Sequence, residues 1–155
     1  MRGLGEVAER LRRSTVQVRA GRRERGGGSG VVWDAGGVIL TNAHVARTRE
    51  LEVELWDGSC LPARVTSRDP RRDLASLRVE GTAGLEAAPV GDSDAVRAGE
   101  LVIAVGNPLG FAGALSTGTV HSREGGWLRA AVQLAILMKV GHLTLRSRER
   151  LEDLG

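Results

Sequence analysis

Short stretches in which apolar and polar residues alternate dominate the chain up to about residue 122. Residues 51–56 read Leu-Glu-Val-Glu-Leu-Trp, the period-two pattern of a strand with one buried face. Other β-branched or apolar runs of strand length fall at 14–20, 30–33, 38–41, 60–67, 74–79, 101–105 and 116–122. Glycine turns at 34–37 and 57–58 separate neighbouring runs. Many short strands joined by tight turns predict an all-β barrel or sandwich.

The two ends of the chain have a different pattern. Leu4, Val7, Ala8 and Leu11 recur at helical spacing with charges between them, which predicts a short amphipathic helix over 4–13. Arg148 and Glu152 at i,i+4 in the charged stretch 146–154 predict a second, exposed helix. Between them, residues 128–137 are almost all apolar, and 136–139 contain the only lysine of the chain. We therefore expect a change of character near residue 136.

Composition narrows the class of protein. The chain has 155 residues, 41% hydrophobic and 26% charged, which is typical of a folded domain and not of a disordered one. The formal net charge is only +3. The basic clusters at 22–25 and 68–72 are interrupted by acids and a proline, so we interpret them as solvated loops and expect no nucleic-acid binding.

Other features exclude further functions. The single Cys60 cannot form an internal disulfide, and it lies in a turn entering a strand, which argues against a catalytic thiol. No apolar segment has the length of a signal peptide or a membrane span. As written, the sequence contains no export or anchoring signal, which is typical of a cytoplasmic protein.

Candidate chemistry centres on a histidine and an aspartate. His44 follows an apolar run in Thr41-Asn42-Ala43-His44-Val45, and Asp73 precedes another strand in 72–77. A histidine base and a carboxylate that orients it are two of the three members of a serine-protease triad. Asp69 is the alternative carboxylate. Outside any wider motif, His44 would be interpreted as a buried histidine at a strand end.

The wider motifs resemble trypsin-like proteases of the bacterial HtrA/Deg type. The segments Gly28-Ser29-Gly30-Val31-Val32-Trp33-Asp34 and 37–45 are similar to the signature of the first barrel in that family. The segment 68–77 resembles the aspartate region of the family, and 102–110 and 116–120 resemble the opening strands of its second barrel. The resemblance covers roughly residues 5–135.

This resemblance implies a chymotrypsin-like double β-barrel with a complete first barrel and an incomplete second one. The expected divisions are a first barrel with its N-terminal helix over 1–98, the opening strands of the second barrel over 99–135, and a divergent tail over 136–155. The resemblance assigns the general base to His44 and the orienting carboxylate to Asp73. It favours Asp73 over Asp69 because Asp73 directly precedes the Leu-Ala strand, as the family pattern requires.

The sequence departs from the family where the nucleophile is expected. The segment 127–135 resembles the approach to the family's serine, but residues 136–141 read Ile-Leu-Met-Lys-Val-Gly where a Gly-Asn-Ser-Gly-Gly turn should follow. Ser29 matches an early strand upstream of His44, and Ser147 lies among arginines without a neighbouring glycine. The oxyanion-hole backbone belongs to the same turn. We therefore expect the serine nucleophile to be absent and the chain to be inactive alone.

Two further hypotheses remain open beside an inactive protease homologue. The chain could be a pseudoprotease that binds a protein partner, or one half of a split protease. The expected partners are a polypeptide substrate or a protein partner, and the oligomeric state is left unassigned. His121 and His142 are interpreted as strand or surface residues, so no metal site and no cofactor are expected. The family commonly works in the cell envelope, so no compartment is assigned.

Overall fold

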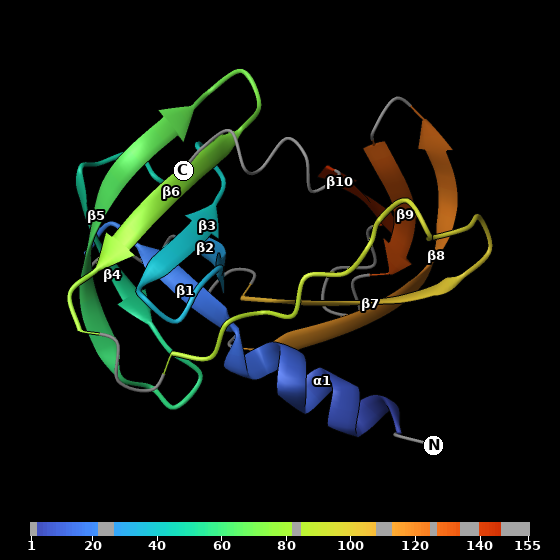
Figure 1. The fold of residues 1–155 in the computed structure, drawn as a ribbon, viewed down its shortest axis with the longest axis horizontal. Helices are drawn as coiled ribbons and strands as arrows, with labels where there is room; N and C mark the ends of the chain where they lie inside the picture. Colours follow the sequence, from blue (N-terminus) through green and yellow to red (C-terminus); the bar gives the residue numbers. More distant parts are fainter. Residues whose placement is uncertain are drawn as a thin grey trace. The chain divides into compact units, whose positions relative to one another are not determined.

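A computed structural model describes residues 3–21, 27–81, 85–107, 113–124, 127–133 and 140–146, and from residue 123 onward it describes the backbone alone. Figure 1 shows the helix and strands along the chain. They are α1 (Leu4–Arg13), β1 (Thr15–Arg19), β2 (Gly28–Val32), β3 (Val38–Thr41), β4 (Glu50–Glu54), β5 (Cys60–Asp69), β6 (Leu74–Val79), β7 (Leu101–Gly106), β8 (Ala114–Glu124), β9 (Trp127–Gln133) and β10 (Val140–Arg146).

The first six strands form a closed barrel in the order β1-β2-β3-β6-β5-β4, all paired antiparallel. The ring closes because β1 pairs with β2 on one edge and with β4 on the other. The β2–β3 turn contains Gly37 at φ 104°, and the β4–β5 turn contains Gly58 at φ 83°. Glycine adopts these left-handed conformations without a steric penalty, so both predicted hairpins form at the predicted turns.

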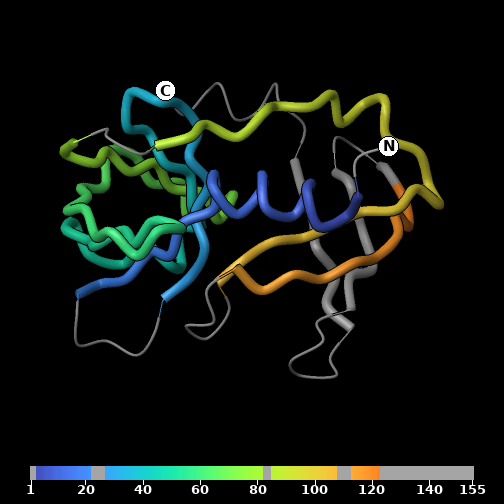
Figure 2. Tube along the Cα trace, turned by 90° about the horizontal axis from the view of Figure 1, so that it is seen from below, coloured from blue at the N-terminus to red at the C-terminus, as the bar shows by residue number. Residues whose placement is uncertain are grey.

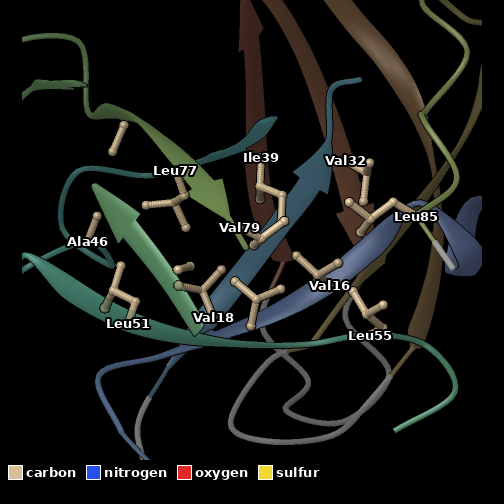
Figure 3. Packing of buried hydrophobic residues seen from close by; sticks show 13 residues of the cluster. Val16, Val18, Val32, Ile39, Ala46, Leu51, Leu55, Leu77, Val79 and Leu85 are labelled. Atoms are coloured by element: carbon tan, nitrogen blue, oxygen red, sulfur yellow. The ribbon is translucent and has the colours of Figure 1, made fainter. Parts of the chain in front are cut away.

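Alternating apolar residues of all six strands fill the barrel (Figure 3). Ile39 and Leu77 face each other across β3 and β6, and both are fully buried. Gly30 lies at the crowded centre, where an added Cβ would meet a methyl group of Ile39 at 3.0 Å and one of Val16 at 3.1 Å. The glycine therefore permits the close approach of β2 to the barrel interior.

The helix α1 leads directly into the first barrel strand (Figure 2). Arg10, Arg12 and Arg13 occupy its last turn, where positive charge is favourable near the carbonyl end of the helix dipole. The hydroxyls of Ser14 and Thr15 donate to the Leu11 carbonyl oxygen at 3.1 and 2.8 Å. These hydrogen bonds satisfy a terminal carbonyl and end the helix at the start of β1.

The remaining strands form a four-stranded sheet in the order β10-β9-β8-β7. A closed barrel followed along the chain by a second sheet, which is open within the described residues, confirms the predicted all-β, chymotrypsin-like class. The chain divides into one compact unit of residues 1–89 and 105–114 and another of residues 90–104 and 115–155. The division of the sequence at residues 98 and 135 stays a prediction.

Two expectations concern the chain ends. The N-terminal helix is confirmed as α1. The helix expected over 146–154 lies outside the described residues, apart from Arg146, which ends β10. Among the described residues, no helix combines the length and the apolar character needed to cross a bilayer.

Candidate active site

A tight turn after β3 carries His44. The amides of Val45 and Ala46 donate to the Asn42 carbonyl oxygen at 3.0 and 3.1 Å. Ala43 and Ala46 are each 1% exposed and anchor the turn in the barrel wall, whereas the His44 side chain between them is 63% exposed. The alternative interpretation of His44 as a buried histidine is therefore wrong.

A glycine of a neighbouring strand makes room for this turn. A Cβ added to Gly28 would lie 2.4 Å from Cγ2 of Val45, a distance that real Cβ atoms do not show. The sequence pattern places Gly28 in a strand motif and gives it no further role. The structure gives it a steric role: its missing side chain lets Val45 pack against β2, which holds the His44 turn close to the barrel.

The two candidate aspartates lie at the two ends of the β5–β6 turn. Asp69 Oδ1 accepts hydrogen bonds from the amides of Arg71 and Arg72 at 3.0 and 3.1 Å, and Asp69 Oδ2 lies 3.4 Å from Arg72 Nε. Asp69 thus caps its own turn. Asp73 ends the turn with φ 53°, the one positive value at a non-glycine among the described residues. Aspartate tolerates this left-handed conformation better than most residues do.

Asp73 makes a two-point contact with His44. Oδ1 accepts the backbone N–H of His44 at 2.9 Å, and Oδ2 lies 2.7 Å from the ring nitrogen Nδ1. An ionised carboxylate can only accept, so Nδ1 carries the hydrogen of this bond. In the neutral imidazole the second nitrogen, Nε2, is then left as a proton acceptor. The structure thus places Asp73 against His44, whereas Asp69 accepts hydrogen bonds from amides of its own turn.

Electrostatics at the pair favour an ionised Asp73. Partial desolvation, which by itself would raise its pKa, is outweighed by hydrogen bonds from the His44 amide and imidazole, by the charge of that imidazole and by the Ala43 amide. The pKa of Asp73 therefore lies below its usual value. With 47% of its side chain exposed, Asp73 forms a pair that solvent screens in part.

Three further side chains bind the backbone around His44. Arg68 donates from Nε and Nη2 to the Ala43 carbonyl oxygen at 3.0 and 2.9 Å. Asn42 Nδ2 donates to the Asp73 carbonyl oxygen at 3.0 Å, and Arg47 Nε donates to the His44 carbonyl oxygen at 2.7 Å. Sequence reasoning assigned none of these contacts.

Arg68 also corrects an expectation. The charge pattern of 68–72 predicts a solvated loop, but Arg68 lies in β5 and its guanidinium group binds the turn that carries His44. The sequence gives only a weak sign of this contact, because Arg68 lies in a run of charged residues. A guanidinium that reaches a carbonyl 25 positions away becomes visible only once the fold is known.

Within the described part of the chain, no candidate nucleophile forms a hydrogen bond with His44. Ser29 Oγ accepts the amide of Asn107 at 2.7 Å, so this hydroxyl serves a backbone contact. Ser147 and residues 134–139 lie outside the described residues. Cys60 is exposed in the first position of β5. His121 is exposed in β8, and no cluster of potential metal ligands occurs among the described residues.

The fold agrees with comparison to known proteins. The sequence profile of the family described as "Trypsin-like peptidase domain" matches residues 28–143. The chain belongs to this family. The match extends over most of the barrel, both members of the His44–Asp73 pair, and the segment in which the family's nucleophile is expected.

Individual relatives narrow the family to the HtrA/Deg type, as the resemblance predicted. The chain is 39% identical over 97 residues to the periplasmic serine endoprotease DegP of Salmonella typhimurium, an alignment that covers 61% of the chain and 20% of the relative. It is 42% identical over 98 residues to the mitochondrial serine protease HTRA2 of Bos taurus, covering 63% and 21%. The chain thus spans about a fifth of the length of these relatives.

Proposed function

We propose that the chain carries the general base and the orienting carboxylate of a serine endopeptidase, His44 and Asp73, without an activated serine. The observation that carries the proposal is the contact of 2.7 Å between His44 Nδ1 and Asp73 Oδ2. Asp73 fixes the tautomer in which Nε2 can accept a proton, and it would stabilise the imidazolium formed on protonation. The substrate class implied by the family is a polypeptide.

The missing step is nucleophilic attack. In the family's reaction a serine hydroxyl attacks the peptide carbonyl while Nε2 takes its proton, and backbone amides bind the oxyanion. The family match runs to residue 143, and residues 123–143 contain no serine. Loss of the serine alone costs about 10⁶-fold in kcat in a comparable triad enzyme. The chain as given is therefore proposed to lack measurable peptidase activity.

Two assays on the purified chain test this proposal. Cleavage of unfolded casein should remain at the level of the buffer, and a fluorophosphonate probe, which labels activated serines, should not react. His44→Ala serves as the matched control, because it removes the base and leaves every serine in place. Casein cleavage or probe labelling that disappears in His44→Ala would overturn the proposed absence of a nucleophile.

A second candidate function is favoured by the open sheet. Within the described residues, β7 and β10 are edge strands of that sheet, and exposed strand edges accept an added strand from a partner. A pseudoprotease that binds an extended segment would form a stable stoichiometric complex without cleaving it. Copurification followed by light scattering tests this candidate, and activity regained on coexpression with a second fragment would instead indicate a split protease.

A further inference from the structure

We propose that Arg68 is a positioning residue for His44, an inference that rests on the catalytic role proposed above for that histidine. Its contact differs from an ordinary surface arginine contact. Two nitrogens of one guanidinium, Nε and Nη2, donate to a single acceptor, the Ala43 carbonyl oxygen, at 3.0 and 2.9 Å. Ala43 itself is 1% exposed, so its carbonyl lies where lost hydrogen bonds are costly.

The acceptor belongs to the peptide group that joins Ala43 to His44. Arg68 holds the C=O end of that group, and Asp73 Oδ1 accepts its N–H end at 2.9 Å. Because a peptide group is planar, restraint at both ends fixes the orientation of the plane. That plane sets the direction in which the His44 side chain leaves the backbone, and so the approach of Nδ1 to Asp73.

A β-bulge directs Arg68 to this position. In the β5–β6 ladder Val65 pairs with Leu77 and Ser67 pairs with Ser76, which leaves Thr66 as the extra residue. The Thr66 hydroxyl donates to the Ser76 carbonyl oxygen at 3.1 Å and so stabilises the irregularity.

The bulge reverses the face on which the following residues lie. Arg68 pairs with Ala75, which is fully buried, so its side chain leaves the sheet on the same face as Ala75, although Arg68 itself is an exposed residue. Without the extra residue, Arg68 would pair with Leu74 and point to the opposite face, because a one-residue shift exchanges the faces of a strand. The bulge and the arginine thus act together.

One hairpin consequently supplies both restraints. Arg68 lies in β5 and Asp73 ends the turn that follows, and Asn42 Nδ2 ties the other side of the His44 turn to the Asp73 carbonyl oxygen at 3.0 Å. Among the described residues, the hydrogen bonds of the Arg68 guanidinium go to the Ala43 carbonyl oxygen and not to the imidazole. Arg68 acts on His44 by fixing the orientation of the Ala43–His44 peptide group through the Ala43 carbonyl.

Proton NMR of the full chain with ¹⁵N-labelled histidine tests the proposal. The Nδ1–H resonance of His44, identified by its disappearance in His44→Ala, reports the bond to Asp73. We expect Arg68→Met to shift or broaden this resonance and to speed hydrogen exchange of the His44 amide by about tenfold or more. Arg68→Lys, which keeps one donor for the carbonyl, should restore much of the signal.

Arg78→Met is the matched control, because Arg78 Nη1 donates to the Gly36 carbonyl oxygen at 2.8 Å elsewhere on the same barrel. It should leave both His44 signals unchanged. The proposal is overturned if folded Arg68→Met keeps the wild-type signals, or if Arg78→Met disturbs them equally. Should Arg68→Met not fold, Arg68→Gln is judged by the same criteria.

The test is independent of peptide cleavage. A wild-type chain without the Nδ1–H resonance would count against the proposed His44–Asp73 pair, whereas an intact wild-type signal that Arg68→Met does not alter would count against Arg68 alone. Measured peptidase activity, or its absence, changes neither result.

Discussion

Asp69 and Asp73 stand at opposite ends of the turn between β5 and β6, and their carboxylates face different partners. Asp69 accepts hydrogen bonds from the Arg71 and Arg72 amides of its own turn. Asp73 accepts hydrogen bonds from the amide and from the ring nitrogen Nδ1 of His44, which lies 29 positions earlier in the chain. Residue type and local composition are the same at both ends. The two carboxylates also differ in backbone conformation, because Asp73 has a positive φ of 53° and Asp69 does not.

The contrast between Asp69 and Asp73 depends first on the packing of the barrel, because β5 and β6 hold the two ends of their turn. Leu77 is fully buried in β6, the strand that follows the turn. Leu77→Ala should lower the free energy of unfolding by about 2–5 kcal/mol, because it removes buried methyl groups and leaves a cavity. Urea denaturation measures the loss. Leu77→Met, which conserves volume, should cost less than about 1.5 kcal/mol; equal losses in the two variants would contradict the packing argument.

Removing the structural carboxylate should affect stability without affecting the histidine. Asp69→Ala deprives two backbone amides of their acceptor, a loss comparable to that of a helix cap, and should cost about 0.5–2 kcal/mol. Thermal unfolding and exchange of the Arg71 and Arg72 amides measure the effect. The His44 Nδ1–H resonance should persist; its disappearance would show that the two ends of the turn are not separable.

Removing the carboxylate that binds His44 should change the pH dependence of stability. The pKa of Asp73 is lower in the folded protein than its unfolded value of about 3.9, so its stabilisation is present above about pH 4 and is lost as pH falls through the lower folded pKa. Asp73→Asn should flatten this acid limb by at most about 1 kcal/mol, because the pair is half-exposed. Denaturation of both proteins between about pH 2 and pH 7 checks it; parallel curves would contradict the assigned shift.

The smallest expected effect concerns a third aspartate, which resembles Asp69. Asp57 accepts the hydroxyl and the amide of Ser59 at 2.6 and 2.9 Å, and these bonds lower the pKa of its carboxyl. Ser59→Ala should raise that pKa toward its usual value, as followed by carboxyl ¹³C NMR. The His44 resonance should not respond. An unchanged Asp57 titration would remove the Ser59 hydroxyl as the main cause.

Much of the barrel could be predicted from the sequence because its strands are amphipathic and its turns contain glycine. The strand expected over 38–41 is β3, and the one expected over 74–79 is β6. The pairing of His44 with Asp73 followed from motif resemblance. Its geometric reason, a left-handed residue that ends the turn, is a property of the folded backbone.

The contacts of Arg68 were beyond the reach of sequence patterns. Its direction depends on the bulge at Thr66, and bulges leave no fixed mark in the alternation of an exposed, charged strand. The carbonyl that it binds belongs to Ala43, and because this contact uses the backbone, the identity of the alanine gives no sign of it. Ser29 is a similar case, since its hydroxyl accepts the amide of Asn107, 78 positions later.

The left-handed backbone at Asp73 sets two demands on one residue. Glycine would suit φ 53° best, but it has no carboxylate to bind His44. Glutamate has the carboxylate, but it lacks the tolerance for this conformation that short polar side chains have. Asparagine fits the backbone and lacks the charge. Aspartate combines a short side chain that tolerates φ 53° with a charged carboxylate that reaches His44, so each of these three replacements should weaken either the backbone fit or the contact with His44.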